Sequence, residues 1–364
     1  MSVRDSLRLL LALTALSGAA GCLNLDDVTT VKDLRVLSVQ ADKPGFLVNL
    51  DDPGSAAAAD LTANLTALVV DPRAPDGLVA VSAVGCPDLL DTITAATGKG
   101  TTLCTPGVNG TVTIAQADPA PAPPAGTPDA AADIEYHPAL VPFGLTPDEV
   151  SLLFTPMPSA SPTIAQAIQY NRDFGIDAIV NLTFTLGTET ASAVKRVVYW
   201  PDLRAQYPDE VPNQNPHIDR IEFYRSRDTT TGDPTDIWAG TPTVSISAKD
   251  KLYVLPVPAA DAVETYPLVS RNMQTMQNET NEVQELLVFD FFATAGTFSP
   301  AERRNQVPLF ADPGSAIHLD SQYNLPSAAD LAKLAPSGTV DIWIIVHDER
   351  GGESWAHETI SVAP

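Results

Sequence analysis

Four ionisable residues near the C-terminus form the group whose types and spacing best suit chemistry. His347, Asp348 and Glu349 precede Gly351-Gly352, and His357 follows it. Two glycines accept the positive φ of a tight hairpin, so the flanks of this turn should lie within reach of each other. Imidazole and carboxylate groups together could hold a divalent metal. The competing interpretation, which we favour, is a solvated turn with two surface histidines and no metal.

The rest of the chain carries no motif of catalysis or cofactor binding. G-x-S-x-G, H-E-x-x-H, Gly-rich phosphate-loop and EF-hand patterns are all missing from the sequence. Trp238, beside Gly240, is the one tryptophan that we expect to be exposed enough to stack on a sugar. Several acidic residues near predicted loop ends lack the spacing of a calcium site, so we expect them to be structural. They are Asp51, Asp52, Asp71, Asp76 and Asp88. The sequence therefore predicts no catalytic residue and no cofactor.

Cys22 points to a different chemistry, acylation. It follows a leader with positive charge at Arg4 and Arg8, an apolar stretch over 9–16, and small residues over 17–21. The apolar stretch is too short to span a bilayer core of roughly 30 Å. The stretch Ala19-Ala20-Gly21-Cys22 resembles the lipobox of bacterial lipoproteins, with Ala19 where Leu is commoner. The resemblance implies cleavage after Gly21 and acylation of Cys22 by chains such as palmitate. Since Leu23 rather than Asp follows, it also implies an outer-membrane anchor.

The other two cysteines, Cys86 and Cys104, form an even pair in a chain expected to reach an oxidising compartment. We predict a disulfide between them, which should stabilise the fold by about 3 kcal/mol. A zinc site is the alternative, but neither cysteine has another Cys or His at ligand spacing.

The chain has 364 residues and a formal net charge of −24. Removal of residues 1–21 leaves 343, enough for two domains. An acidic chain repels phosphate backbones and anionic head groups, so we expect no nucleic-acid partner and membrane contact through the acyl anchor alone.

Period-two apolar patterns predict an all-β fold. After a polar tether over 22–33, a first β-sandwich is expected over 34–200, with a Pro-rich excursion at 117–128 and one short helix at 163–171. Its predicted strands are 34–41, 61–69, 78–85, 111–116, 176–186 and 194–199.

Prolines and acids over 201–216 predict an open linker to a second sandwich over 217–364. Its expected strands are 221–224, 244–248, 252–257, 286–293, 340–346 and 355–362. The strand at 340–346 is apolar on both faces, so it should be central and buried on both sides.

Three stretches of the second domain resemble bacterial immunoglobulin-like and polycystic-kidney-disease-like domains. They are Phe292-Ala293-Thr294-Ala295-Gly296-Thr297-Phe298, Gly338-Thr339-Val340 and the turn at 346–352. The whole chain is also similar to lipoproteins of Gram-negative bacteria. These resemblances imply tandem immunoglobulin-like antiparallel sandwiches and no catalytic residues.

We therefore expect a lipid-anchored envelope protein that acts as a non-enzymatic binding or structural module. Its protein or glycan partner is not identified by the sequence. The Pro-rich excursion and the segment 256–284, which contains Met273 and Met276, are the candidate contact surfaces. Two alternatives stay open: an envelope glycan hydrolase using paired loop carboxylates, and a subunit of an outer-membrane complex.

Overall fold

The computed structural model describes residues 28–73, 79–87, 112–114, 134–138, 140, 142–157, 161–228, 231–306 and 316–364. The leader, Cys22, Cys104 and the Pro-rich excursion lie outside these ranges, and so does the side chain of Cys86. Acylation and the disulfide therefore stay predictions. No helix among the described residues is both long and apolar enough to cross a bilayer.

The first half folds as a β-sandwich. One sheet has the order β1-β4-β7 and the other β2-β10-β9-β5-β6. These strands are β1 (Arg35–Ala41), β2 (Gly45–Val48), β4 (Leu65–Val70), β5 (Ala80–Pro87), β6 (Val112–Ile114), β7 (Glu135–Tyr136), β9 (Ile176–Leu186) and β10 (Glu189–Pro201). The remaining elements are η1 (Ala58–Leu61), β3 (Thr62–Ala63), β8 (Phe143–Gly144), α3 (Pro147–Phe154) and α4 (Pro162–Phe174).

The second half repeats this architecture, with sheets β12-β11-β14-β20-β18 and β13-β22-β21-β17-β19. Its strands are β11 (Ile218–Arg227), β12 (Pro234–Ile237), β13 (Thr243–Ser245), β14 (Leu252–Pro258), β17 (Leu287–Ala293), β18 (Thr297–Ser299), β19 (Glu302–Arg304), β20 (Ser321–Asn324), β21 (Thr339–Asp348) and β22 (Glu353–Ala363). The helix α5 (Ala328–Leu334) and the hairpin of β15 (Thr265–Arg271) and β16 (Asn278–Gln284) complete it.

Both halves share one connectivity. In each, a short early strand pairs parallel to the last strand, β2 with β10 and β13 with β22, while the other ladders are antiparallel. The expected all-β fold of two immunoglobulin-like sandwiches is confirmed. The first sandwich has the parallel closing pair of the second although it lacks the glycine-centred stretch at 292–298.

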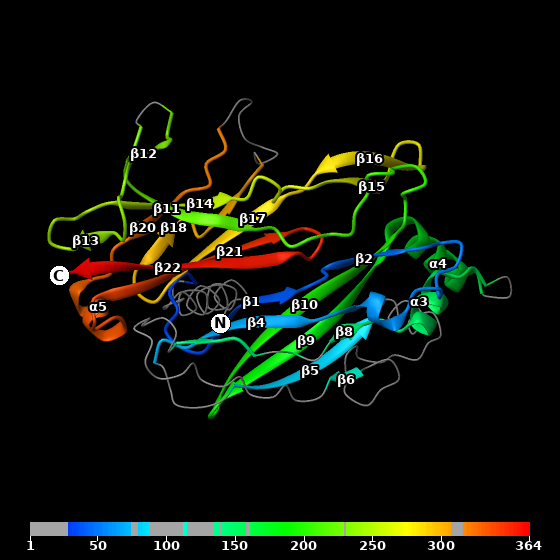
Figure 1. The fold of residues 1–364 in the computed structure, drawn as a ribbon, viewed down its shortest axis with the longest axis horizontal. Helices are drawn as coiled ribbons and strands as arrows, with labels where there is room; N and C mark the ends of the chain where they lie inside the picture. Colours follow the sequence, from blue (N-terminus) through cyan, green and yellow to red (C-terminus); the bar gives the residue numbers. More distant parts are fainter. Residues whose placement is uncertain are drawn as a thin grey trace, which may run out of the picture.

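The two sandwiches are packed against each other through a shared apolar cluster. Leu68 and Val70 of β4 meet Trp343 and Ile345 of β21 in this cluster. The opposite face of β4 fills the first core and the opposite face of β21 fills the second. Figure 1 shows the resulting order of layers, in which the blue β1 and β4 lie between the green β9 and β10 and the red β22. The prediction that 340–346 is central and buried on both sides is confirmed.

Two segments expected to be open are instead integrated into the fold. In the expected tether, Val31 N donates to Ala293 O and Ala293 N donates to Thr29 O, each at 2.8 Å. In the expected linker, Asn215 joins both sandwiches: its Nδ2 donates to Ala41 O at 2.7 Å, and its Oδ1 accepts from Glu353 N at 2.9 Å. Backbone and amide groups of these segments supply the bonds, which composition alone does not reveal.

Candidate functional site at the domain junction

In the turn between β21 and β22, Asp348, Arg350 and Gly352 are buried, whereas Glu349 is exposed. The expectation of a solvated turn is therefore wrong for most of its residues. The side chain of Asp348 accepts from Arg350 N at 2.8 Å and Gly352 N at 2.7 Å, which closes the turn from inside. Gly351 has φ +96°, and a Cβ added there would lie 3.0 Å from Arg196 O of the first sandwich. The turn therefore lies against β10, and its buried polar groups are paired within the protein.

Arg350 is the centre of this junction. Its side chain is 6% exposed, and its Nε donates to Glu285 Oε1 at 2.9 Å. Its Nη2 forms an ion pair with Glu264, and its guanidinium lies 4.1 Å from the centroid of the Tyr266 ring. A guanidinium group is planar and has several N–H donors at its edge. It can therefore bind two carboxylates through its edge while its face stacks on an aromatic ring.

The junction holds more carboxylates than cations, and the pKa values of these carboxylates are raised. Burial, reinforced by the charge of Asp348, raises the pKa of Glu285 to about 7. Burial also raises the pKa of Glu264 and of Asp348 above the ordinary range, although Arg350 opposes the shift. Each of these groups is held by hydrogen bonds within the fold, so this cluster fixes the β21–β22 turn to the rest of the second sandwich and to the linker.

The four candidate metal ligands do not come together. His347 Nε2 lies 3.2 Å from Asp290 Oδ2 of β17, whereas His357 Nε2 lies 3.2 Å from Asp341 Oδ1. His347 pairs with Glu353 in the ladder and His357 pairs with Trp343, four residues further along β21. Within the described ranges, no cluster of three or more His, Cys, Asp or Glu could bind a metal.

Both histidines are tied to acids. The hydrogen bond to Asp290 raises the pKa of His347. Burial lowers the pKa of His357, but Asp341 and Glu135 outweigh burial and raise it overall. Each histidine thus forms a structural contact with an acidic side chain beside or on β21.

Of the other candidate residues, Asp71 and Trp238 have structural contacts. Asp71 binds Arg73 through two oxygens, at 2.8 Å and 2.6 Å, rather than standing in an open loop. Asp51 and Asp52 are exposed, and Asp76 and Asp88 lie outside the described residues. Trp238 is half-buried under Arg225, whose guanidinium lies 3.9 Å from its ring centroid, so it offers no open platform. Met273 and Met276 are exposed at the tip of the β15–β16 hairpin, as a contact surface requires.

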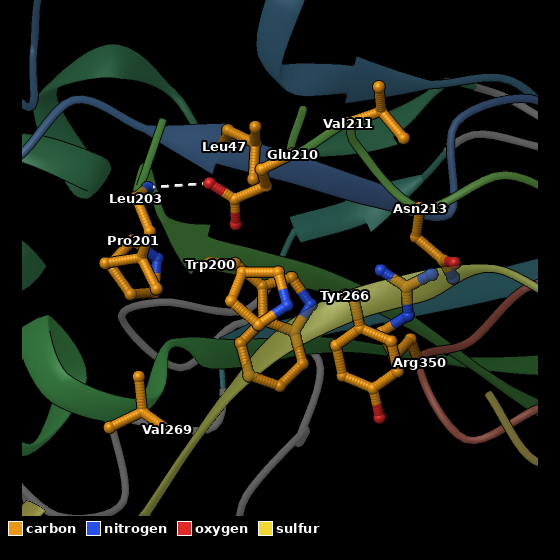
Figure 2. A pocket seen from close by; sticks show the side chains of 11 residues that line it. Leu47, Trp200, Pro201, Leu203, Glu210, Val211, Asn213, Tyr266, Val269 and Arg350 are labelled. Atoms are coloured by element: carbon orange, nitrogen blue, oxygen red, sulfur yellow. Dashed lines mark hydrogen bonds between the residues drawn. The ribbon is translucent and has the colours of Figure 1, made fainter. Parts of the chain in front are cut away.

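A pocket opens beside the cluster, where the linker passes between the sandwiches. Its apolar wall includes Leu47 of β2, Trp200 of β10 and Val269 of β15, and its polar groups include Glu210 and Asn213 of the linker (Figure 2). Glu210 Oε2 accepts from Leu203 N at 2.7 Å, and its other oxygen is turned toward Trp200. Burial raises the pKa of this carboxylate.

Two buried polar atoms of the pocket have no hydrogen-bond partner among the described residues: Trp200 Nε1 and Asn213 Oδ1. Asn213 is 4% exposed, so a buried acceptor is left unsatisfied unless a molecule in the pocket donates to it. Sequence reasoning missed this pocket because it treated 201–216 as an open linker. The polar run Asn213-Gln214-Asn215 between two prolines was the available signal.

Comparisons with known proteins give little further guidance. No protein-family model matches the chain, and no curated protein matches it. Solved structures that match include a red sea bream transglutaminase (9% identity, TM-score 0.20) and dimeric latent PorU from Porphyromonas gingivalis (9%, TM-score 0.18). The match takes in 92% of this chain in both cases, and 32% and 24% of those proteins. A partial N-terminal region of an enterococcal surface protein matches at 7% identity and TM-score 0.23, over 94% of this chain and 97% of the other. Likenesses at these TM-scores carry no argument about function.

Proposed function

We propose that this chain is an outer-membrane lipoprotein, acylated at Cys22, whose joined sandwiches act as a non-enzymatic binding module. The leader over 1–21 and the lipobox-like Ala19-Ala20-Gly21-Cys22 support the anchor. One observation supports the binding role. The ionisable groups at the junction bond to one another, whereas the pocket beside them has polar atoms without a partner among the described residues.

The alternative of a glycan hydrolase needs two carboxyl groups that flank an open cleft. Glu264 and Glu285 are gathered by the fold, but both bind the same guanidinium. The side chain of Glu285 is 1% exposed, so a glycosidic bond cannot reach it in this conformation. This arrangement supports a structural role for the pair.

Turnover can be tested directly on the purified chain. We expect no release of product from peptidoglycan fragments or from envelope peptides over hours at saturating protein. Reproducible hydrolysis that disappears in Glu264→Gln or Glu285→Gln, with the thermal midpoint retained, would contradict the proposal and support the enzyme.

The anchor is tested by replacing the acylated cysteine. Cys22→Ala should stop incorporation of labelled palmitate and move the protein from the detergent to the aqueous phase, because the acyl chains supply the membrane affinity. Cys86→Ala is the matched control and should keep the label. Detergent partitioning of Cys22→Ala at the wild-type level would rule out this anchor.

A further inference from the structure

The strand β2 has a free edge that opens on a groove. It is an outer strand of its sheet, paired with β10 alone among the described strands. Val198 N donates to Pro44 O at 3.0 Å and Asp202 N donates to Val48 O at 2.9 Å, which fixes the parallel register. Because facing residues alternate along a strand, Phe46 bonds toward β10, and the N–H and C=O of Gly45 and Leu47 point away.

The outward groups of Leu47 are left without a strand partner. Across the part of the chain that the structure describes, no hydrogen bond engages its outward N–H or C=O. Leu47 lines a groove of about 590 Å³ between the linker and the segment 56–61. Unpaired groups along a strand edge are a template for another strand.

The pocket of Figure 2 lies next to this groove, since Leu47 and Asn213 line both. A strand lying along β2 would bring a side chain to this pocket. There it would meet the apolar surfaces of Trp200 and Val269, the unpaired Asn213 Oδ1 and the carboxylate of Glu210. No Lys, Arg or His among the described residues forms an ion pair with Glu210.

We propose that β2 binds an extended segment of a partner protein by strand addition, with a lysine or arginine side chain of that segment directed at Glu210. The main chain of such a segment supplies donors and acceptors for Leu47, and its amides and basic group can satisfy Asn213 Oδ1. A chain of net charge −24 attracts a basic partner over a distance. The inference rests on the proposed binding function and names the chemistry of the partner.

The test begins with an array of unrelated ten-residue peptides probed with the purified chain. Peptides that bind should carry Lys or Arg among β-branched or aromatic residues. For the best binder, Leu47→Pro should weaken affinity about tenfold, since it removes one outward donor and its hydrogen bond. Leu47→Ala keeps that N–H and should weaken affinity less.

Two further measurements separate strand addition from a folding defect. Leu47→Pro should keep the thermal midpoint, whereas Phe46→Pro should lower it, because the N–H of Phe46 faces β10 and its ring is buried against Tyr199. If Leu47→Pro does not fold, N-methylation of alternate residues of the peptide tests the same bond on the unchanged protein. Alternate N–H groups of the bound peptide face β2. N-methylation of that alternate set should abolish binding, whereas N-methylation of the other set should not.

The basic preference is tested by Glu210→Gln, which keeps an acceptor for Leu203 N. We expect it to equalise the affinities of a lysine peptide and its norleucine analogue. The inference is overturned if no peptide binds, or if binding is indifferent to both Leu47→Pro and N-methylation. A chain that binds no peptide and turns over no substrate would refute strand addition alone and leave the proposed function intact.

Discussion

At the scale of single residues, Arg350 contacts several buried groups at once. It is buried beside Glu264, Glu285 and the aromatic ring of Tyr266, with Asp348 two residues earlier in the same turn. Removing one charged side chain from a buried ionic group leaves the remaining charges unpaired away from water. The resulting loss of stability is larger than the net contribution of the intact group. The junction is therefore sensitive to this one side chain.

We expect Arg350→Met to reduce the free energy of unfolding by about 3–5 kcal/mol, because it leaves two buried carboxylates unpaired. Arg304→Met, which removes an exposed pair with Glu302, should change it by less than about 1 kcal/mol. Urea unfolding followed by fluorescence measures both. Equal effects for the two variants would mean that Arg350 is not the centre of the junction.

Glu285 should make stability depend on pH. Its pKa of about 7 in the fold lies above the unfolded value, so the folded chain holds the extra proton between about pH 4.5 and 7. Stability from this group is therefore present at the acidic end of that window and is lost as the pH rises through 7. The raised pKa values of Glu264, Asp348, His347 and His357 act in the same direction.

Unfolding free energies at pH 5.5 and 7.5 check this expectation. The wild-type chain should be more stable at pH 5.5, and Glu285→Gln should reduce the difference because it cannot titrate. Glu282→Gln removes an exposed carboxylate of the same type and should keep the wild-type difference. Identical pH profiles for all three proteins would exclude Glu285 as the source.

At the scale of elements, the strands and helices with a regular apolar period were predictable from the sequence. Elements that are very short or mostly polar were not. The period-two run at 176–186 predicts β9 with its observed bounds, and the helix expected at 163–171 is the central part of α4. The hairpin β15–β16 was missed, since its polar residues Asn278, Glu279 and Glu282 are exposed on a two-stranded ribbon and give no apolar period. The same holds for β2, whose four residues are too few for a period.

The candidate site was less predictable than the fold, because tertiary contacts create it. The turn at 348–352 has the composition of a solvated loop, and it is buried only by tertiary contacts with β10, the linker and the side chains around Arg350. Apolar residues on both faces of β21 did signal another packed layer, whereas the apolar residues on the second face of β4 were not recognised as such a signal. For β21 the sequence predicted burial on both sides without naming the layer that covers it.

Gly175, where α4 ends and β9 follows, should tolerate no side chain. It has φ +75°, and a Cβ there would lie 2.6 Å from Tyr199 O. We expect Gly175→Ala to reduce the free energy of unfolding by about 3 kcal/mol or more, from strain and the backbone clash together.

Gly187, in the turn from β9 to β10, is the matched control. It has φ +61°, but a Cβ added there would meet no atom of the described residues within 4 Å. Gly187→Ala should cost about 1 kcal/mol from the backbone conformation alone. Chemical unfolding of both variants separates the two contributions, and equal costs would show that the contact with Tyr199 is relieved by movement.

At the scale of the whole molecule, the sandwiches should unfold together. Trp343 is fully buried between them, and its Nε1 donates to Glu135 Oε1 of β7 at 2.6 Å. We expect a single unfolding transition for the wild-type chain and two for Trp343→Ala, which removes about 3–5 kcal/mol of packing from the interface.

Phe291→Ala is the control for this prediction, since Phe291 is equally buried but lies within the second core. It should shift the transition to lower urea and leave it single. Calorimetry or urea unfolding followed at two wavelengths distinguishes the cases. Two transitions in the wild-type chain would show that the sandwiches are independent.

The pairing of Thr29 and Val31 with Ala293 has a mechanical consequence under the proposal that Cys22 is acylated. The chain from Cys22 to Thr29 has a contour length of about 25 Å at most. The segment from Cys22 to Thr29 therefore attaches to the C-terminal sandwich, although it belongs to the N-terminal part of the chain. In an acylated chain this sets the height and tilt of the molecule above the lipid. It also means that a pull from the membrane loads β17 of the second sandwich before it loads the first.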